Sequence, residues 1–128
     1  MKSNIQLAGK RVLVVGLART GVATSLFCAQ RGAQVTATDT KTEQELPAVA
    51  AELRAAGVQL ELGGHSTETF QAQDLIIQSP GVPAELAPFV AAREQGIPVW
   101  SELELAWRFL RGRLIAITGS NGKTTTTA

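Results

Sequence analysis

Several features are scarce in this sequence of 128 residues, and each scarcity excludes a class of protein. The single cysteine, Cys28, excludes an internal disulfide and a cysteine cluster for zinc. A formal net charge of +1 argues against nucleic-acid binding through bulk electrostatics. No apolar run approaches the roughly 18 residues of a membrane span, and residues 1–6 lack the apolar stretch of a signal peptide. We therefore expect a cytoplasmic protein with no membrane or nucleic-acid partner.

What the sequence does contain is enough apolar material for one core. Apolar residues make up 45% of the chain, and charged residues make up 18%. The charged share lies below the roughly 25% usual for globular chains, which argues against disorder. Cys28 lies in an Ala/Leu-rich stretch and is predicted to be a small core residue.

Short β-branched runs alternate with longer Ala/Leu-rich runs along the chain. The β-branched runs predict strands at 11–16, 34–39, 58–62, 74–78, 98–100 and 113–118. The Ala/Leu-rich runs predict helices at 22–31, 46–56, 84–95 and 101–110, the last opened by a capping box of Ser101 and Glu104. This rhythm is typical of an α/β, Rossmann-like fold with a parallel sheet of about five strands and helices on both faces. Ligands of such sheets bind beyond the carboxyl ends of the strands.

The loop after the first predicted strand resembles a dinucleotide-binding fingerprint. It reads Gly-Leu-Ala-Arg-Thr-Gly over residues 16–21, with Ala18 where the fingerprint has its middle glycine. Gly16 permits the tight turn, and Gly21 allows close packing of helix on strand. Backbone amides at the helix N-terminus, together with the Thr20 hydroxyl, favour a pyrophosphate.

Asp39 ends the second predicted strand, 18 residues after Gly21, where an acid usually contacts the nucleotide sugar. Two alternatives remain open from these residues alone. The loop could be a turn that needs glycine only for its geometry, or the domain could bind the dinucleotide of an NAD(P)-dependent oxidoreductase.

A second glycine loop follows the predicted strand at 113–118. It reads Gly-Ser-Asn-Gly-Lys-Thr over residues 119–124, a shortened phosphate loop with Ile117 where the full pattern has glycine. Lys123 would reach the β- and γ-phosphates of ATP, and the Thr124 hydroxyl would bind Mg²⁺. The expected ATP-binding residues are Gly119, Ser120, Asn121, Gly122, Lys123, Thr124 and Thr125.

The phosphate loop argues against the oxidoreductase alternative, because a nicotinamide enzyme has no use for such a loop. It favours an ATP-dependent enzyme instead. Only four residues follow Thr124 in this sequence, so we expect these 128 residues to be an inactive fragment with no cofactor bound. We expect two units: a nucleotide-binding domain over 1–112 and the truncated start of an ATP-binding domain over 113–128.

Five segments in this order resemble the N-terminal part of the Mur ligases of peptidoglycan biosynthesis. They are residues 16–21, Asp39-Thr40-Lys41, Ser79-Pro80-Gly81, Ser101-Glu102-Leu103-Glu104 and residues 119–124. The resemblance covers nearly the whole chain, but only the first of that family's three domains. Asn121 and the Ser-Pro-Gly turn favour the branch that adds D-glutamate to UDP-N-acetylmuramoyl-L-alanine over the branch that adds L-alanine.

The resemblance implies a site for the UDP part of that substrate. Ala18, Arg19 and Thr20 would meet the diphosphate. Asp39, Thr40 and Lys41 would line the uracil pocket, with Asp39 accepting from uracil N3–H. Ser79, Pro80 and Gly81 would close its other side.

For a complete enzyme the resemblance implies an ATP-dependent amide-forming ligase. ATP and Mg²⁺ would convert the alanyl carboxylate to an acyl phosphate, which the amine of D-glutamate attacks. Lys123 and Thr124 would be its catalytic residues in this chain, Thr124 being the metal ligand. Such an enzyme is expected to be a monomer that serves cell-wall synthesis, cell shape and cell division, with its D-glutamate site outside this chain.

Three further residues receive structural interpretations. His65, in a Gly-Gly-His-Ser turn, is predicted to be a solvated loop residue. Trp100 and Trp107 are predicted to pack the last helix onto the sheet.

Overall fold

The computed structural model describes residues 7–83 and 85–109. In chain order the elements are β1 (Arg11–Val15), α1 (Arg19–Gln30), β2 (Gln34–Asp39), α2 (Pro47–Ala55), β3 (Gln59–Leu62), α3 (Thr67–Gln71), β4 (Leu75–Gln78), α4 (Ala87–Glu94) and β5 (Val99–Ser101). Residues 102–109 form a further helical segment. The predicted strand at 113–118 and the phosphate loop at 119–124 lie outside the described residues.

The strands form one parallel five-stranded sheet in the order β3-β2-β1-β4-β5, which confirms the predicted α/β fold. β1 is central, with Val12 paired to Val35 of β2 on one side and to Leu75 of β4 on the other. The chain builds outward from β1 through β2 to β3 and then returns to the other side of β1. The order therefore reverses between β1 and β4, which is the switch point where such sheets bind ligands.

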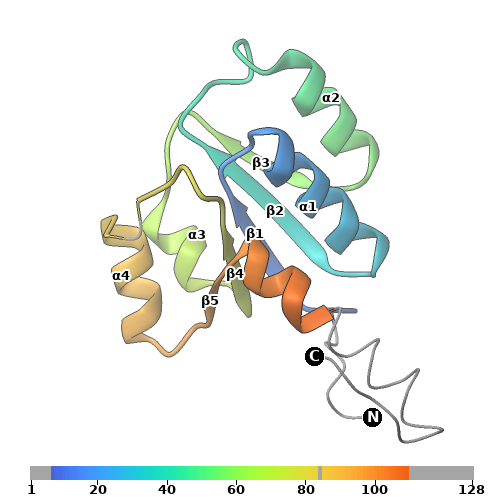
Figure 1. Ribbon diagram of the computed structural model, residues 1–128. Coiled ribbons are helices and arrows are strands. Elements are labelled where there is room, and N and C mark those ends of the chain that lie inside the picture. The colour runs from blue at the N-terminus through green and yellow to red at the C-terminus, as the bar shows by residue number, and fades with distance from the viewer. Residues whose placement is uncertain (1–6, 84, 110–128) are drawn as a thin grey trace, which may run out of the picture.

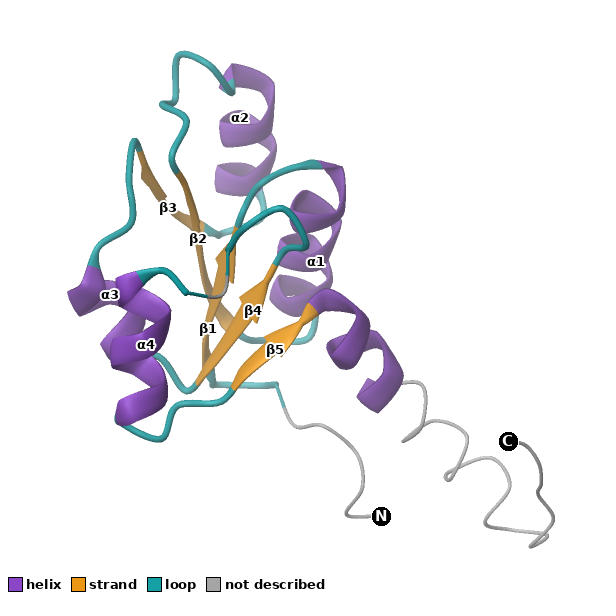
Figure 2. Cartoon of the chain, turned by 60° about the vertical axis from the view of Figure 1, so that its left-hand side comes forward, coloured by secondary structure: helices purple, strands orange, loops and turns teal. Residues whose placement is uncertain are grey.

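Helices cover both faces of the sheet, as predicted (Figure 1). α1 and α2 lie on one face and α3 and α4 on the other, while the helical segment 102–109 follows β5 on the α1 side (Figure 2). The side chains of β1 alternate between the two faces of the sheet, so each face needs a covering layer. Val12 and Val14 belong to the core cluster that holds Cys28 and Leu53, while Leu13 belongs to the cluster around α4. Cys28 is fully buried, as predicted, and burial raises the pKa of its thiol to about 11.

The structure corrects three predictions about the helices. α1 begins at Arg19 rather than at residue 22, so the second half of the glycine loop is the first helical turn. α4 begins at Ala87 rather than at residue 84, because Pro88 suits the first turn of a helix. The sequence analysis missed α3, whose five residues are too few to show a helical period.

The two tryptophans differ from each other. Trp100 packs against the core cluster, as predicted. Trp107 is 54% exposed, so the prediction that it packs onto the sheet is wrong. Leu105 and Phe109 instead anchor their helix: Leu105 is 4% exposed, and the Phe109 ring lies edge-on to Phe27 at 4.8 Å.

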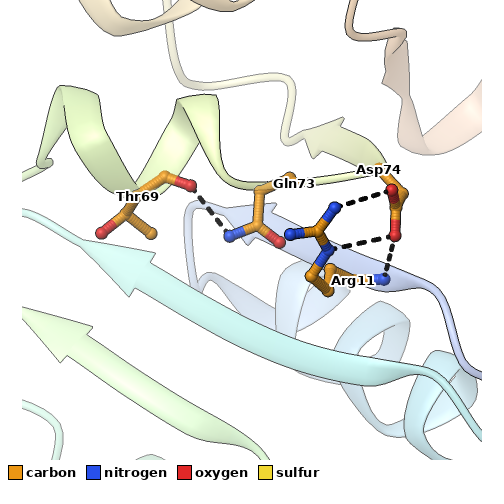
Figure 3. A network of polar contacts seen from close by, with 4 residues as sticks. All are labelled: Arg11, Thr69, Gln73 and Asp74. Atoms are coloured by element: carbon orange, nitrogen blue, oxygen red, sulfur yellow. Dashed lines mark hydrogen bonds and ion pairs between the residues drawn. The ribbon is translucent and has the colours of Figure 1, made fainter.

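A polar network ties the amino ends of β1 and β4 together, at the sheet edge opposite the glycine loop (Figure 3). Asp74 accepts hydrogen bonds from the Arg11 backbone amide at 2.9 Å and from its guanidinium at 3.1 and 3.3 Å. This pairing lowers the pKa of Asp74 to about 2. Gln73 Nε2 donates to the Thr69 carbonyl at 2.8 Å and so closes the end of α3.

Candidate functional site

Backbone hydrogen bonds join the loops that follow β1, β2 and β4. The Gly16 amide donates to the Thr38 carbonyl at 2.9 Å, and the Ser79 amide donates to the Val15 carbonyl at 3.0 Å. Parallel pairing thus continues to the last residue of each strand. The structure brings the predicted 16–21 loop between the other two predicted segments, one beginning at Asp39 and the other at Ser79.

Both glycines of the first loop have the roles predicted for them. Gly16 has a φ of +99°, and a Cβ there would lie 2.9 Å from the Ser79 Cβ. A Cβ on Gly21 would lie 1.9 Å from the Gly16 carbonyl oxygen. Helix α1 therefore approaches β1 closely enough to require glycine, which places its N-terminus at the switch point.

The N-terminus of α1 is open to an anion. Ala18 is the N-cap residue, with an extended ψ of −177°, and no side chain of the described residues caps the helix there. The first turn carries no acidic residue, so no carboxylate of that turn competes for its amides or for the helix dipole. Ala18, Arg19 and Thr20 are all exposed on this turn. The arrangement suits a phosphate group.

Asp39 holds two loops with one carboxylate. Its Oδ2 accepts from the Leu17 amide at 2.7 Å, and its Oδ1 accepts from the Lys41 amide at 2.9 Å. The side chain is half-buried, while the neighbouring Thr40 and Lys41 are exposed. Each carboxylate oxygen can accept a second hydrogen bond, so Asp39 can still receive a ligand donor while it fixes the glycine loop.

Ser79 lies beneath the surface that its neighbours form. Its side chain is 3% exposed, and its Oγ lies 3.0 Å from the Gly16 carbonyl oxygen and 2.7 Å from Glu102 Oε2. Pro80 and Gly81 are exposed. The predicted Ser-Pro-Gly side of the uracil pocket therefore has two parts. One is the buried Ser79 hydroxyl, which holds the loops, and the other is the exposed Pro-Gly turn.

The sequence analysis missed Glu102 as a residue of this region. It directly follows β5 and lies within the fourth segment of the family resemblance, which was the available signal. Its contact with Ser79 joins positions 23 residues apart in sequence. No local pattern predicts such a pair.

His65 lies in a loop, as predicted, but it is half-buried rather than solvated. Its Nδ1 lies 2.9 Å from the hydroxyl oxygen of Thr38, which also donates to the Gly64 carbonyl at 3.1 Å. Burial lowers the pKa of His65, against the smaller opposing effect of the Asp39 and Glu61 carboxylates. The turn after β3 is thereby tied to the buried end of β2.

Three further observations concern metal binding, membrane spans and cavities among the described residues. Over 7–83 and 85–109, no group of three or more His, Cys, Asp or Glu residues is arranged to hold a metal ion. In the same ranges, no helix is both long and apolar enough to cross a membrane. An apolar groove of about 390 Å³ lies between α1 and residues 102–109, lined by Phe27 and Phe109 among others.

The strand order and the glycine loop at the switch point define an α/β domain of the Rossmann-like class. Residues 10–101 match the family described as "Mur ligase MurD-like, N-terminal domain". This chain belongs to that family.

Curated relatives agree with the family match. A UDP-N-acetylmuramoylalanine–D-glutamate ligase of Acidobacterium capsulatum is 50% identical over 124 residues, covering 97% of this chain and 27% of the relative. The enzyme of the same name from Geotalea daltonii is 51% identical over 123 residues, covering 96% of this chain and 27% of the relative. The chain thus spans about a quarter of the length of these relatives.

Solved structures share the fold. A UDP-N-acetylmuramate-alanine ligase from Thermotoga maritima has a TM-score of 0.67 at 24% identity, covering 80% of this chain and 23% of that one. D-lactate dehydrogenase from Escherichia coli has a TM-score of 0.55 at 20% identity, covering 76% and 29%. The fold therefore occurs in ligases and dehydrogenases, and the sequence relatives decide for the ligase family over the oxidoreductase alternative.

Proposed function

We propose that this chain is the UDP-binding domain of an ATP-dependent ligase that joins D-glutamate to UDP-N-acetylmuramoyl-L-alanine. The observation that carries the proposal is the uncapped N-terminus of α1 at the switch point between β1 and β4, with the loops of Asp39 and Ser79 on either side. The names of the relatives supply the substrate.

The diphosphate would bind over the first turn of α1. Backbone amides there point outward from the helix and have no partner within it. The Arg19 guanidinium would add charge, and the Thr20 hydroxyl would add a donor. Ala18 suits this position because a side chain that caps the helix would compete with the phosphate for the same amides.

The uracil ring would lie between the turn after β2 and the turn after β4. Asp39 would use a remaining lone pair to accept from N3–H, while Thr40 and Lys41 supply exposed polar groups beside it. Pro80 and Gly81 would give the opposite wall a flat surface with little side chain. Ser79 lies buried beneath this wall, and its hydroxyl would hold the glycine loop rather than contact the ring.

The ligase reaction would take place in the longer protein. ATP with Mg²⁺ supplies the phosphoryl group that activates the alanyl carboxylate as an acyl phosphate, after which the amine of D-glutamate forms the amide. Gly119 to Thr125 would cradle the ATP phosphates, with Lys123 and Thr124 as catalytic residues and Thr124 on the metal. We further propose a monomeric cytoplasmic enzyme of cell-wall synthesis, with a boundary near residue 112 between the UDP domain and the ATP domain.

Calorimetric titration of the 128-residue chain with UDP and with NADH tests this proposal. We expect one UDP per chain and weaker or undetectable binding of NADH. Amide resonances of residues 16–20, Ser79 and Gly81 should shift on addition of UDP. Tighter binding of NADH, or no binding of UDP, would overturn the proposal.

A pair of charge variants locates the site. Arg19→Gln removes a cation beside the proposed diphosphate, and Lys10→Gln removes one next to Arg11 at the opposite edge of the sheet. Arg19→Gln should weaken UDP binding by about tenfold, the effect of losing one charged hydrogen bond. Lys10→Gln should leave it unchanged. Equal effects would show that net charge rather than a site governs binding.

A further inference from the structure

Glu102 connects the last described helix to the glycine loop through a chain of hydrogen bonds. Glu102 is the first residue after β5, so it starts at the carboxyl edge of the sheet. Its Oε2 lies 2.7 Å from the Ser79 hydroxyl at the end of β4. That hydroxyl in turn lies 3.0 Å from the carbonyl oxygen of Gly16 at the end of β1. One polar chain thus crosses three neighbouring strand ends.

Among the described residues, the Ser79 hydroxyl has these two hydrogen-bond partners. It is buried with its residue at 3% exposure, and it carries one proton between a carbonyl and a carboxyl oxygen. With one proton, the hydroxyl can donate to both acceptors only as a three-centre bond, whose arms are 2.7 Å to Glu102 and 3.0 Å to Gly16. The contact with Glu102 thereby fixes the rotation of the Ser79 side chain against the Gly16 carbonyl. Loss of Glu102 would free the hydroxyl to turn and would remove its support from the β5 side.

The Gly16–Leu17 peptide is held from both sides as a result. On the β2 side, the Gly16 amide donates to Thr38 and the Leu17 amide donates to Asp39. On the β4 side, Ser79 meets the Gly16 carbonyl. This peptide directly precedes the N-cap of α1, so its orientation sets the direction of the first-turn amides.

We propose that Glu102 is a positioning residue for diphosphate binding, acting through Ser79 on the Gly16 peptide. The inference rests on the proposed UDP-binding function and adds a residue to it. Among the described residues, the hydrogen-bonded route from Glu102 to the glycine loop passes through the Ser79 hydroxyl, so we expect its effect at the phosphate end of the ligand rather than at the uracil ring.

The test compares UDP with uridine in the 128-residue chain. Glu102→Ala should weaken UDP binding by about tenfold, the loss of one charge-assisted hydrogen bond, and leave uridine binding unchanged. Glu102→Gln should stay within about twofold for both ligands, since its amide oxygen can accept from Ser79. Glu104→Ala is the matched control, because Glu104 lies on the same helix and pairs with Arg108 at 3.0 Å. It should change neither affinity.

A double-mutant cycle tests the route through Ser79. If Glu102 acts through that hydroxyl, Glu102→Ala should have no further effect on UDP binding in a Ser79→Ala background. Additive losses would overturn the proposed route. Equal losses of UDP and uridine affinity in Glu102→Ala would overturn the positioning role, since a general loosening of the domain would give that result.

Backbone resonances separate this inference from the proposed function. The Gly16 and Leu17 amide signals of the ligand-free chain should shift in Glu102→Ala and stay in place in Glu104→Ala. Unchanged signals overturn the inference even if UDP binds. Failure of the unaltered chain to bind UDP would overturn the proposed function, while the same signals would still show whether Glu102 holds the loop.

Discussion

Asp39 shows how one side chain can serve both structure and binding. Its carboxylate accepts from Leu17 and Lys41, so it fixes the glycine loop and the turn after β2 before any ligand arrives. A nucleotide that donates a third hydrogen bond to Asp39 would therefore bind to loops that are already ordered. Pre-ordering of this kind lowers the entropy cost of binding.

Substitution of Asp39 by Asn tests this double role. Asn has one acceptor oxygen, so its NH₂ group must face one of the two backbone amides. We expect a loss of about 1–3 kcal/mol in the free energy of unfolding, the cost of one unsatisfied polar group, together with weaker UDP binding. Urea denaturation and calorimetry measure the two effects. Glu52→Gln, an exposed change on α2, is the control, and an unchanged unfolding midpoint in Asp39→Asn would contradict the prediction.

His65 makes the stability of the domain depend on pH. Burial holds its folded pKa below the ordinary 6.5, so the unfolded chain takes up a proton first as the pH falls. The contribution of neutral His65 is therefore complete above about pH 6.5 and decreases as the pH falls below that value. Urea denaturation at pH 7.5 and 5.5 should show lower stability at the acid value. His65→Gln should reduce this difference, and an equal difference in the variant would assign it to other groups.

At the residue scale, the sequence predicted that the loops of Gly16, Asp39 and Ser79 meet at the carboxyl ends of the strands, but not how their residues bond to one another. Gly16, Gly21 and Asp39 stand at fixed places in a strand-loop-helix pattern, which is local and therefore readable. The bonds of Ser79 to Gly16 and Glu102 span 63 and 23 residues and depend on the strand order. The Thr38–His65 contact is similar, since it needs β3 beside β2.

Among the elements, α1 carries the proposed phosphate site because it lacks a cap. Ala18→Asp would supply both a capping oxygen and a negative charge at its N-terminus. We expect a gain of about 1 kcal/mol in the free energy of unfolding and a loss of most UDP affinity, since the new carboxylate takes the place of the phosphate. Ala18→Ser should give a similar gain with a smaller loss of affinity. A melt and a titration of each variant measure these opposite effects, and unchanged UDP affinity in Ala18→Asp would place the phosphate elsewhere.

The contact between α1 and β1 gives a second prediction at this scale. Gly21→Ala would place its Cβ 1.9 Å from the Gly16 carbonyl, so the helix must move away from the strand. We expect a loss of about 3 kcal/mol in the free energy of unfolding, as for an overpacked core. Gly81→Ala is the matched control, because a Cβ there meets nothing within 4 Å. Similar unfolding midpoints for the two variants would contradict the observed packing.

For the whole molecule, periodicity predicted the α/β class, five parallel strands and helices on both faces. It could not give the helical start of α1, because the sequence pattern around Gly21 fits a loop as well as a helix. It could not identify α3 either, since five residues span little more than one turn. The exposure of Trp107 depends on which face residues 102–109 turn to the core, and Leu105 and Phe109 decide that through long-range contacts.

The extent of the folding unit is a property of the whole molecule and differs from the extent of the family match. The match ends at residue 101, yet Leu105 lies in the core cluster with Cys28, and Phe109 packs on Phe27. A chain shortened to residues 1–101 should therefore lose several kcal/mol of stability, since burial of one leucine alone contributes about 2–5 kcal/mol. A chain of residues 1–112 should keep the unfolding midpoint of all 128 residues, as expected if the domain boundary lies near residue 112. Urea denaturation of the three chains measures this, with Leu105→Ala as the point variant that isolates the helix contact. Equal midpoints for 1–101 and 1–112 would show that the last helix contributes nothing to the core, and a lower midpoint for 1–112 than for 1–128 would move the boundary toward the C-terminus.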